Sequence, residues 1–205
     1  WQKIVGFHTR NVIHRGHEYI QQESLQKINA DAIYISPVVG KKKPGDFTAD
    51  AILAVYQAMI RNGYYRPYEA LLGTFNTYSR YSGPREAVFT AICRKNFGCS
   101  HFIIGRDHTG VGNFYSPDAS QKMFEQVDIG MEILTFDTVS FCSKCNMVIT
   151  DCIHGNSKKM EISGSKVRSS LMDEVSIPEY LMREDIAQVL IDLYNTTPDA
   201  VFEKS

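Results

Sequence analysis

The chain has 205 residues, which suits one domain or one domain with a small appendage. Apolar residues make up 43% and charged residues 22%, an ordinary balance for a globular protein that needs no disulfide staples. The formal net charge of -1 excludes a nucleic-acid carrier held by bulk charge, and no apolar run approaches the ~18 residues of a membrane span. We therefore expect neither nucleic acid nor a membrane as partner. Because the chain begins at Trp1, without an initiator Met, and soon enters an apolar segment, we expect it to be part of a longer or fused chain.

Short apolar segments alternate along the chain with segments of helical periodicity. The apolar segments predict buried strands at 4–7, 32–35, 70–73, 101–104 and 131–134. Apolar residues spaced three and four apart predict helices at 15–28, 51–59, 84–95 and 183–194. Thr48 is a suitable N-cap for the second of these helices, and Pro84 is suitably placed as the first residue of the third.

This alternation is typical of an α/β fold in which helices cover both faces of a parallel sheet. We predict a Rossmann-like, doubly wound parallel sheet in a principal domain over residues 1–170. A small inserted zinc knuckle is expected at about 139–157, and a C-terminal helical segment over 171–205. Ligands of such sheets bind beyond the carboxyl ends of the strands, so the polar segments after the first and fourth strands are the places to look for a site.

The segment after the first strand holds His14 and His17 at the start of a predicted helix. Residues three apart share one helix face, so both imidazoles point into the same crevice. The helix N-terminus offers free N–H groups and a positive dipole to a phosphate, and Gly16 lets the backbone approach it. The imidazoles can then stabilise negative charge on a reacting phosphate. The alternative is that both histidines only complete a helix cap.

Two further segments combine glycine or serine with arginine. Gly105-Arg106 opens a glycine-rich turn directly after the fourth strand, where an arginine and free backbone N–H groups suit an anion. Ser163 or Ser165 is a candidate N-cap and phosphate ligand at the start of a short helix, with Arg168 one turn later. Taken singly, an ordinary turn and an ordinary serine-capped helix with a solvated arginine explain these segments as well.

Five cysteines are present, an odd number, and three of them fall within 11 residues. Such spacing in a chain without an export signal is typical of a metal site rather than of disulfides, and it favours the cytoplasm. We predict a closed, structural Zn²⁺ site. The alternative is a set of free buried cysteines. The predicted ligands are Cys142, Cys145, Cys152 and His154, of which His154 has the least usual spacing.

Several of these segments match the motifs of a known family. His14-Arg15-Gly16-His17 resembles the His-x-Gly-His signature of the nucleotidylyltransferase superfamily, and Ile162 to Arg168 resembles its Ile-Ser-x-Thr-x-x-Arg motif. The longer strings are similar to those of the ATP sulfurylase (sulfate adenylyltransferase) family, as are the turn at 105–110 and the string Arg94-Lys95-Asn96-Phe97-Gly98. The resemblance runs from about Gly6 to Tyr194, which is nearly the whole chain.

The resemblance implies transfer of AMP from Mg·ATP to an oxyanion, with sulfate as the default acceptor, adenylyl sulfate as the product and pyrophosphate as the leaving group. Mg²⁺ would enter with the triphosphate, and the family also implies a homo-oligomer. By position, the catalytic residues would be Arg10, Asn11, His14, His17 and Arg106. The nucleotide would contact Thr9, Gly16, Gly105, Asp107, His108, Gly110, Ser163, Ser165 and Arg168. The oxyanion would contact His8, Arg10, Arg106 and Thr109.

Three residues depart from the family pattern, and two of them lie in the implied acceptor pocket. His8 stands where the family has Gln, Thr109 where it has Ala, and Val12 where it has Pro. An imidazolium at position 8 would suit a more highly charged acceptor than sulfate. This leaves a second hypothesis, a nucleotidyltransferase that uses ATP or CTP with an organophosphonate or phosphate-ester acceptor. A third hypothesis is a catalytically silent nucleotide-binding or regulatory domain.

Overall fold

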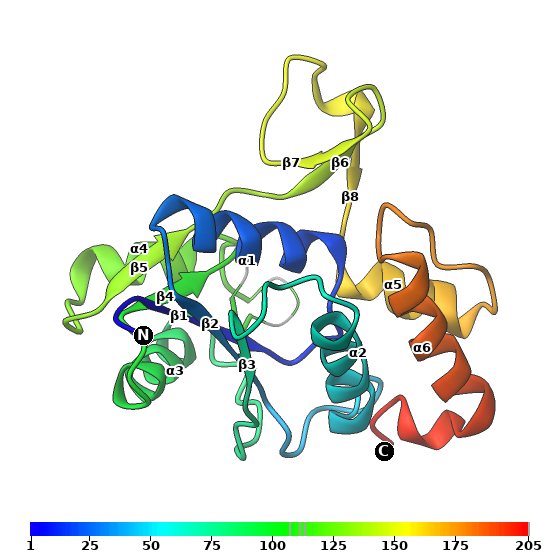
Figure 1. Ribbon diagram of the computed structural model, residues 1–205, viewed down its shortest axis with the longest axis horizontal. Coiled ribbons are helices and arrows are strands. Elements are labelled where there is room, and N and C mark those ends of the chain that lie inside the picture. Colours follow the sequence, from blue (N-terminus) through cyan, green and yellow to red (C-terminus); the bar gives the residue numbers. More distant parts are fainter. Residues whose placement is uncertain (107, 111, 113, 205) are drawn as a thin grey trace.

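The computed structural model describes residues 1–106, 108–110, 112 and 114–204, and it confirms the predicted α/β fold (Figure 1). Five parallel strands form the main sheet in the order β3-β2-β1-β4-β5, which places β1 at its centre. The strands are β1 (Ile4–Thr9), β2 (Ala32–Pro37), β3 (Ala70–Leu72), β4 (His101–Ile104) and β5 (Glu132–Thr135). The helices are α1 (Arg15–Lys27), α2 (Ala49–Arg61), α3 (Pro84–Asn96), α4 (Ala119–Gln126), α5 (Gly164–Met172) and α6 (Glu184–Thr196), and two short helical turns are η1 (Asn156–Lys158) and η2 (Pro198–Ala200).

Helices cover both faces of the sheet because alternate residues of each strand point to opposite sides. Val5 and Phe7 of β1 lie in a large apolar core with residues of α1, α2 and α6. Phe102 of β4 lies in a smaller core with Ala87 and Ala91 of α3. Figure 1 shows α1 and α3 on opposite sides of the sheet. The doubly wound arrangement therefore follows from strands that are apolar on both faces.

Gly6 lies in the middle of β1 and lets α3 approach the sheet closely. A Cβ at this position would meet the Phe102 ring at 3.0 Å and the side-chain carbons of Arg94 at 3.1 and 3.2 Å. Glycine inside a strand often marks a close approach of this kind. The space above Gly6 holds the aliphatic part of Arg94, whose head group reaches His8 farther along the same strand.

The start of α1 is fixed both by its own cap and by the C-terminal segment. His14 is the N-cap, and its Nδ1 accepts a backbone N–H of the first turn at 3.2 Å. The N–H of Arg15 donates to Leu181 O at 2.8 Å, which satisfies an amide that the helix itself leaves free. Glu18 is buried, and its carboxylate forms an ion pair with Arg183 through three hydrogen bonds, two of 3.0 Å from Nε and one from Nη2. The segment before α6 therefore helps to hold the first turn of α1 in place.

The predicted caps and boundaries are close to the observed ones. Thr48 caps α2 by accepting the N–H of Ala51 at 3.2 Å, and Pro84 is the first residue of α3. Helix α1 ends at Lys27, one residue before the predicted end, and β5 begins one residue later than predicted. The structure also contains α4, an element that the sequence pattern did not predict.

A three-stranded antiparallel sheet lies outside the main sheet, with its strands in the order β7-β6-β8. The strands are β6 (Ser140–Cys142), β7 (Met147–Ile149) and β8 (Lys159–Glu161). Figure 1 shows this small sheet projecting from the body of the molecule beyond α1. The ring centres of Phe141 and Tyr180 lie 5.5 Å apart, and Val148 packs against the main core, so the base of the small sheet is anchored.

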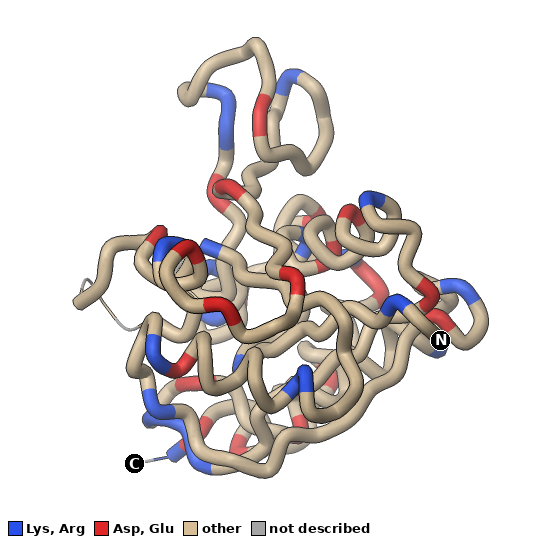
Figure 2. The backbone as a smooth tube through the Cα atoms, turned by 90° about the vertical axis from the view of Figure 1, so that its left-hand side faces the viewer, with Lys and Arg blue, Asp and Glu red and all other residues tan. Residues whose placement is uncertain are grey.

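Charged residues of both signs are interspersed along the backbone (Figure 2). This distribution matches the formal net charge of -1. The positive charge that an anionic ligand needs must therefore come from a local site. Among the residues that the structure describes, no helix has the length and apolar character needed to cross a membrane.

Candidate active site

A cavity of about 450 Å³ lies at the carboxyl ends of β1 and β4, where ligands of such sheets bind. Its volume is in the range of small-molecule sites. It is lined by the predicted site residues His8, Thr9, Arg10, Asn11, His14, Gly16, His17, Gly105, Arg106, His108, Thr109, Gly110, Ser163, Ser165 and Arg168. The remaining predicted residue, Asp107, lies outside the described residues. The fold thus brings together three segments that are far apart in the sequence.

Helices α1 and α5 both begin at the wall of the cavity. At α1 the wall contains the N-cap His14 and Gly16, and at α5 it contains the N-cap Ser163 and Gly164. The Oγ of Ser163 accepts a backbone N–H of the first turn at 3.4 Å, so Ser163 rather than Ser165 is the cap. The two helix N-termini add positive dipole to one space, which favours a polyanion such as a triphosphate.

His14 and His17 form a stacked pair with ring centres 3.7 Å apart. Burial, followed by repulsion from His17, holds the pKa of His14 well below its usual value, and burial lowers the pKa of His17 to about 4. The pair is therefore uncharged at neutral pH. His14 does complete the helix cap, but Nδ1 of His17 is buried without a hydrogen bond of normal geometry among the described residues. The His17 ring interacts with the backbone of Val12, so the helix cap alone does not account for this histidine.

The turn after β4 is tied to the segment after β1 and to α3. Nη2 of Arg10 donates to Gly110 O at 2.7 Å, and the guanidinium carbon lies 5.0 Å from the centre of the Tyr81 ring. Thr109 is buried with a φ of 57°, and its hydroxyl lies 2.8 Å from Gly83 O. Thr109 therefore holds the turn against the start of α3, and Arg10 is positioned before any ligand binds.

His8 is buried at the cavity wall, and its charge differs from the expectation drawn from the sequence. Its Nδ1 lies 3.0 Å from Nη2 of Arg94, a residue to which the sequence pattern assigned no role. Burial, followed by the neighbouring groups Arg94, His108 and Arg10, holds the pKa of His8 well below its usual value. The expected imidazolium is therefore wrong, because burial beside two arginines favours the neutral ring. The argument for a more highly charged acceptor fails with it.

Several other cavity residues escaped prediction from the sequence. Asp46 is buried, its Oδ1 lies 3.3 Å from Nη2 of Arg168, and its Oδ2 accepts the hydroxyl of Tyr81 at 2.7 Å. Lys43 also lines the cavity, and its Nζ lies 3.8 Å from Asp46. The signal for this group is the run of lysines at 41–43 after the second strand, for which a phosphate-attracting loop and a solvated loop were both open, since parallel strands end at the same edge of the sheet.

The cavity histidines predict a loss of stability in mild acid. His8, His14, His17 and His108 are neutral in the folded chain, and burial lowers the pKa of His108 to about 3. The unfolded chain takes up protons as the pH falls below about 6.5, whereas the folded chain resists them down to its lower pKa values. The free energy of unfolding should therefore fall as the pH drops from about 6.5 to 4, and each histidine that stays neutral in the folded chain contributes up to about 1.4 kcal/mol per pH unit. Urea unfolding at several pH values measures this slope, and a constant free energy across that window would contradict it.

Residues 1–193, which are most of the chain, match the family model described as ATP-sulfurylase. This chain belongs to the ATP-sulfurylase family. Its curated relatives include the sulfate adenylyltransferase of Staphylothermus marinus, 42% identical over 194 residues, and that of Carboxydothermus hydrogenoformans, 41% identical over 201 residues. These matches cover 93% and 96% of this chain but 50% and 52% of the relatives. The chain therefore spans about half the length of the curated relatives it matches.

Solved structures share the fold of this ATP-sulfurylase family member. The hexameric APS kinase from Thiobacillus denitrificans aligns with a TM-score of 0.67 and 16% identity over 97% of this chain and 37% of its own. A bifunctional NMN adenylyltransferase/ADP ribose pyrophosphatase from Francisella tularensis aligns with a TM-score of 0.60 and 12% identity over 96% of this chain and 51% of its own. At such low identities the likeness concerns the fold alone.

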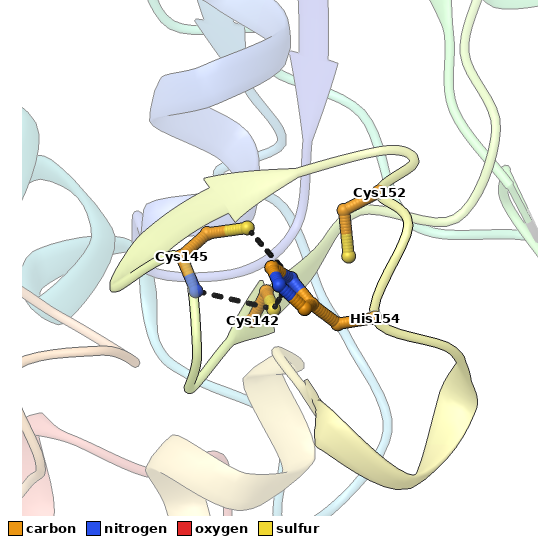
Figure 3. Close-up of side chains that lie close together, drawn as sticks. All are labelled: Cys142, Cys145, Cys152 and His154. Atoms are coloured by element: carbon orange, nitrogen blue, oxygen red, sulfur yellow. Dashed lines mark hydrogen bonds between the residues drawn. The ribbon is translucent and has the colours of Figure 1, made fainter.

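The four predicted metal ligands of this family member lie together beside the small sheet (Figure 3). Their ligand atoms all lie within 4.8 Å of one another. Nδ1 of His154 is 3.2 Å from Sγ of Cys145 and 3.6 Å from Sγ of Cys142. The N–H of Cys145 donates to Sγ of Cys142 at 3.4 Å and lowers the pKa of the Cys142 thiol, while the Cys142 thiolate raises the pKa of Cys145, so Cys142 is the first of the two to become the thiolate that a metal binds. Cys142, Cys145, Cys152 and His154 therefore form a group that could hold a metal ion, and none of them lines the cavity.

Proposed function

We propose that this chain carries the catalytic site of a sulfate adenylyltransferase. The observation that carries the proposal is the convergence of two helix N-termini, a stacked histidine pair and arginine side chains on one cavity. In the reaction an oxygen of sulfate attacks the α-phosphorus of ATP, and a new bond forms between that oxygen and phosphorus. The bond from the α-phosphorus to the bridging oxygen breaks, and pyrophosphate leaves with the electron pair. The products are adenylyl sulfate and pyrophosphate.

The two helix starts would form the binding site for the triphosphate. Free N–H groups at the start of α1 and α5 would bind phosphate oxygens beside His14, His17 and Ser163. Because both histidines are neutral, each can donate one hydrogen bond to a phosphate oxygen, and the reaction needs no proton transfer from them. Asn11 lies against the start of α5, where a Cβ on Gly164 would meet its side chain at 3.2 Å, and it would contact the α-phosphate. Mg²⁺, which arrives with ATP, would neutralise charge on the phosphates.

The acceptor would bind beside the arginines that follow β1 and β4. Arg10 is held by Gly110 O and by the face of the Tyr81 ring, so its charge is fixed in place. Arg106 lines the same cavity and is exposed. Because sulfate is itself the nucleophile, no side chain has to attack. The site would therefore act by positioning the two substrates and by stabilising the charge of the transition state.

We also propose that the cluster of three cysteines and His154 binds Zn²⁺. Three thiolates and one imidazole are a donor set that tetrahedral zinc favours, and the four ligand atoms already lie near one another. Four protein ligands leave no open position for a substrate. When bound, the ion would therefore cross-link the small sheet and would take no part in the reaction.

Pyrophosphate release tests the proposed activity. The chain is incubated with Mg·ATP or Mg·CTP, together with sulfate, a phosphonate, a phosphate ester or no acceptor. We expect sulfate-dependent release with ATP. Release only with an organic acceptor, or only with CTP, would assign another substrate to the site, and nucleotide binding without release would assign a silent domain. The expected homo-oligomer, the cytoplasmic location and the lack of a nucleic-acid partner stay predictions.

A further inference from the structure

Arg94 is a buried cation that the reaction described above does not use. It lies on α3 with a fully buried side chain, and its guanidinium carbon is 4.0 Å from the centre of the Phe75 ring. None of the ion pairs among the described residues includes Arg94. Its Nε and Nη1 atoms also have no hydrogen-bond partner in the described part of the chain. A buried charge without a counter-ion is costly, so its presence calls for a functional reason.

The hydrogen bonds of Arg94 are directed at the ends of β1 and β2. Nη2 donates one N–H to Ser36 O at 2.8 Å, and its second N–H is shared between Ser36 Oγ and Nδ1 of His8, each at 3.0 Å. His8 and Ser36 are opposite each other in the register of the two strands. Gly6 favours this reach, because a Cβ there would crowd the stem of Arg94. Arg94 thus links β1 and β2, two adjacent strands, at their carboxyl ends, where the cavity lies.

This contact determines the tautomer of His8. A guanidinium offers N–H donors and no acceptor, so Nδ1 of His8 can only accept a hydrogen bond from it. The single ring proton of neutral His8 is then on Nε2. The charged and titratable groups that face the ring are Arg94 from α3, Arg10 after β1 and His108 after β4, and all of them oppose its protonation. His8 therefore offers the cavity one N–H donor and no acceptor.

We propose that Arg94 is a positioning residue that acts through His8 and makes the acceptor site select oxyanions that carry no proton. The inference rests on the proposed function, in which His8, Arg10 and Arg106 border the acceptor. With the tautomer of His8 set, all three side chains are donors. They suit a tetrahedral oxyanion such as sulfate, whose oxygens are all acceptors at neutral pH. Hydrogen phosphate or a protonated phosphonate keeps a P–O–H group, which would face donors and lose the hydrogen bond it makes in water.

The tautomer can be tested without turnover by NMR of the chain with isotope-labelled histidine. The His8 signals, identified by their loss in His8→Phe, should show a bare Nδ1 and a protonated Nε2 between about pH 5.5 and 8. A proton on Nδ1, or a titration near the usual histidine pKa, would overturn the inference. This spectrum needs no substitution at Arg94, so it decides the question even where variants of that buried residue do not fold.

Kinetics test the role of Arg94 in acceptor choice. Arg94→Met removes the charge and keeps most of the volume. We expect the KM for sulfate to rise about 10-fold, the KM for ATP to stay within about 2-fold, and the preference for sulfate over hydrogen phosphate to fall about 10-fold in competition. Arg85→Met, at an exposed arginine of the same helix, is the matched control and should change none of these constants.

A double substitution separates positioning from general support of the fold. In a His8→Phe background, Arg94→Met should leave the KM for sulfate and the sulfate preference unchanged, because Arg94 acts through the His8 ring. Equal effects of Arg94→Met in both backgrounds, or a parallel rise in the KM for ATP, would show a merely structural role and overturn the inference.

If the proposed activity is absent, binding measurements still test the role of Arg94. If no acceptor supports pyrophosphate release, calorimetric binding of sulfate and phosphate in the presence of Mg·ATP replaces the kinetic constants. Tighter binding of sulfate than of phosphate, reduced in Arg94→Met and accompanied by the expected tautomer, would support the inference although adenylyl transfer is absent. Equal binding of the two anions by the wild type, or no binding of sulfate, would overturn it.

Discussion

Replacing His17 by alanine should lower the rate constant for sulfate-dependent pyrophosphate release about 100- to 1,000-fold. The imidazole is fixed by stacking on His14 and by the edge of Phe7, and its Nδ1 is buried without a hydrogen bond of normal geometry. A donor held in this way can stabilise charge that develops on the phosphates without having to reorganise first. The KM for ATP should change much less, because the N-termini of α1 and α5 would still bind the triphosphate.

His101 provides the matched control for this substitution. It is a buried histidine, but it begins β4, its Nε2 lies 3.2 Å from Glu132, and it does not line the cavity. His101→Gln should keep the wild-type rate constant, and thermal unfolding would show that both variants fold. His17→Ala should also make the acid-induced loss of stability shallower, since one buried group that resists protonation is gone. A rate constant for His17→Ala within about 3-fold of wild type would contradict the assigned role.

The elements that could be predicted from the sequence are those in which the order of apolar and polar residues reflects which side chains are buried. Strands β1, β2 and β4 are buried on both faces and therefore occur as short apolar runs. Helix α4 was missed because it is short and carries only two large apolar side chains, Met123 and Phe124, which are too few to show a helical period. Strands β6, β7 and β8 have three residues each and are largely half-buried or exposed, which is too short for a period of two to be recognised.

The residues of the cavity wall could be predicted where they directly follow the end of a strand in the sequence. The segments after β1 and β4 are such places, because these strands are neighbours in the sheet and end at the same edge. Arg94 lies on a helix behind the sheet, and the family string that begins at Arg94 assigns it no role. Gly6 is the signal that points to it, since a glycine inside a buried strand indicates a close approach. The charge of His8 was mispredicted because its pKa depends on neighbours that only the fold brings together.

Loss of the proposed zinc should unfold the small sheet and loosen two parts of the cavity wall. Strands β6, β7 and β8 are short, and a sheet of this size is not stable alone in water. Residues 137–139 lead into the small sheet and residues 161–163 lead out of it, and both segments line the cavity. The second segment includes Ser163, the N-cap of α5. The metal would therefore affect nucleotide binding through the chain that connects the two sites, without touching the nucleotide.

Cys142→Ser tests this connection. The wild-type chain should hold about one equivalent of zinc, and the variant should hold none. Proteolysis between residues 139 and 161 should become faster, and the KM for ATP should rise about 10-fold because the start of α5 is no longer fixed. Cys93→Ser, at a half-buried cysteine of α3 outside the cluster, should keep both the metal and the KM. Zinc retained by Cys142→Ser would place the metal elsewhere. Zinc lost without faster proteolysis or a higher KM would mean that the cavity wall is held by the main core alone, through Ile162 and Val167 rather than through the small sheet.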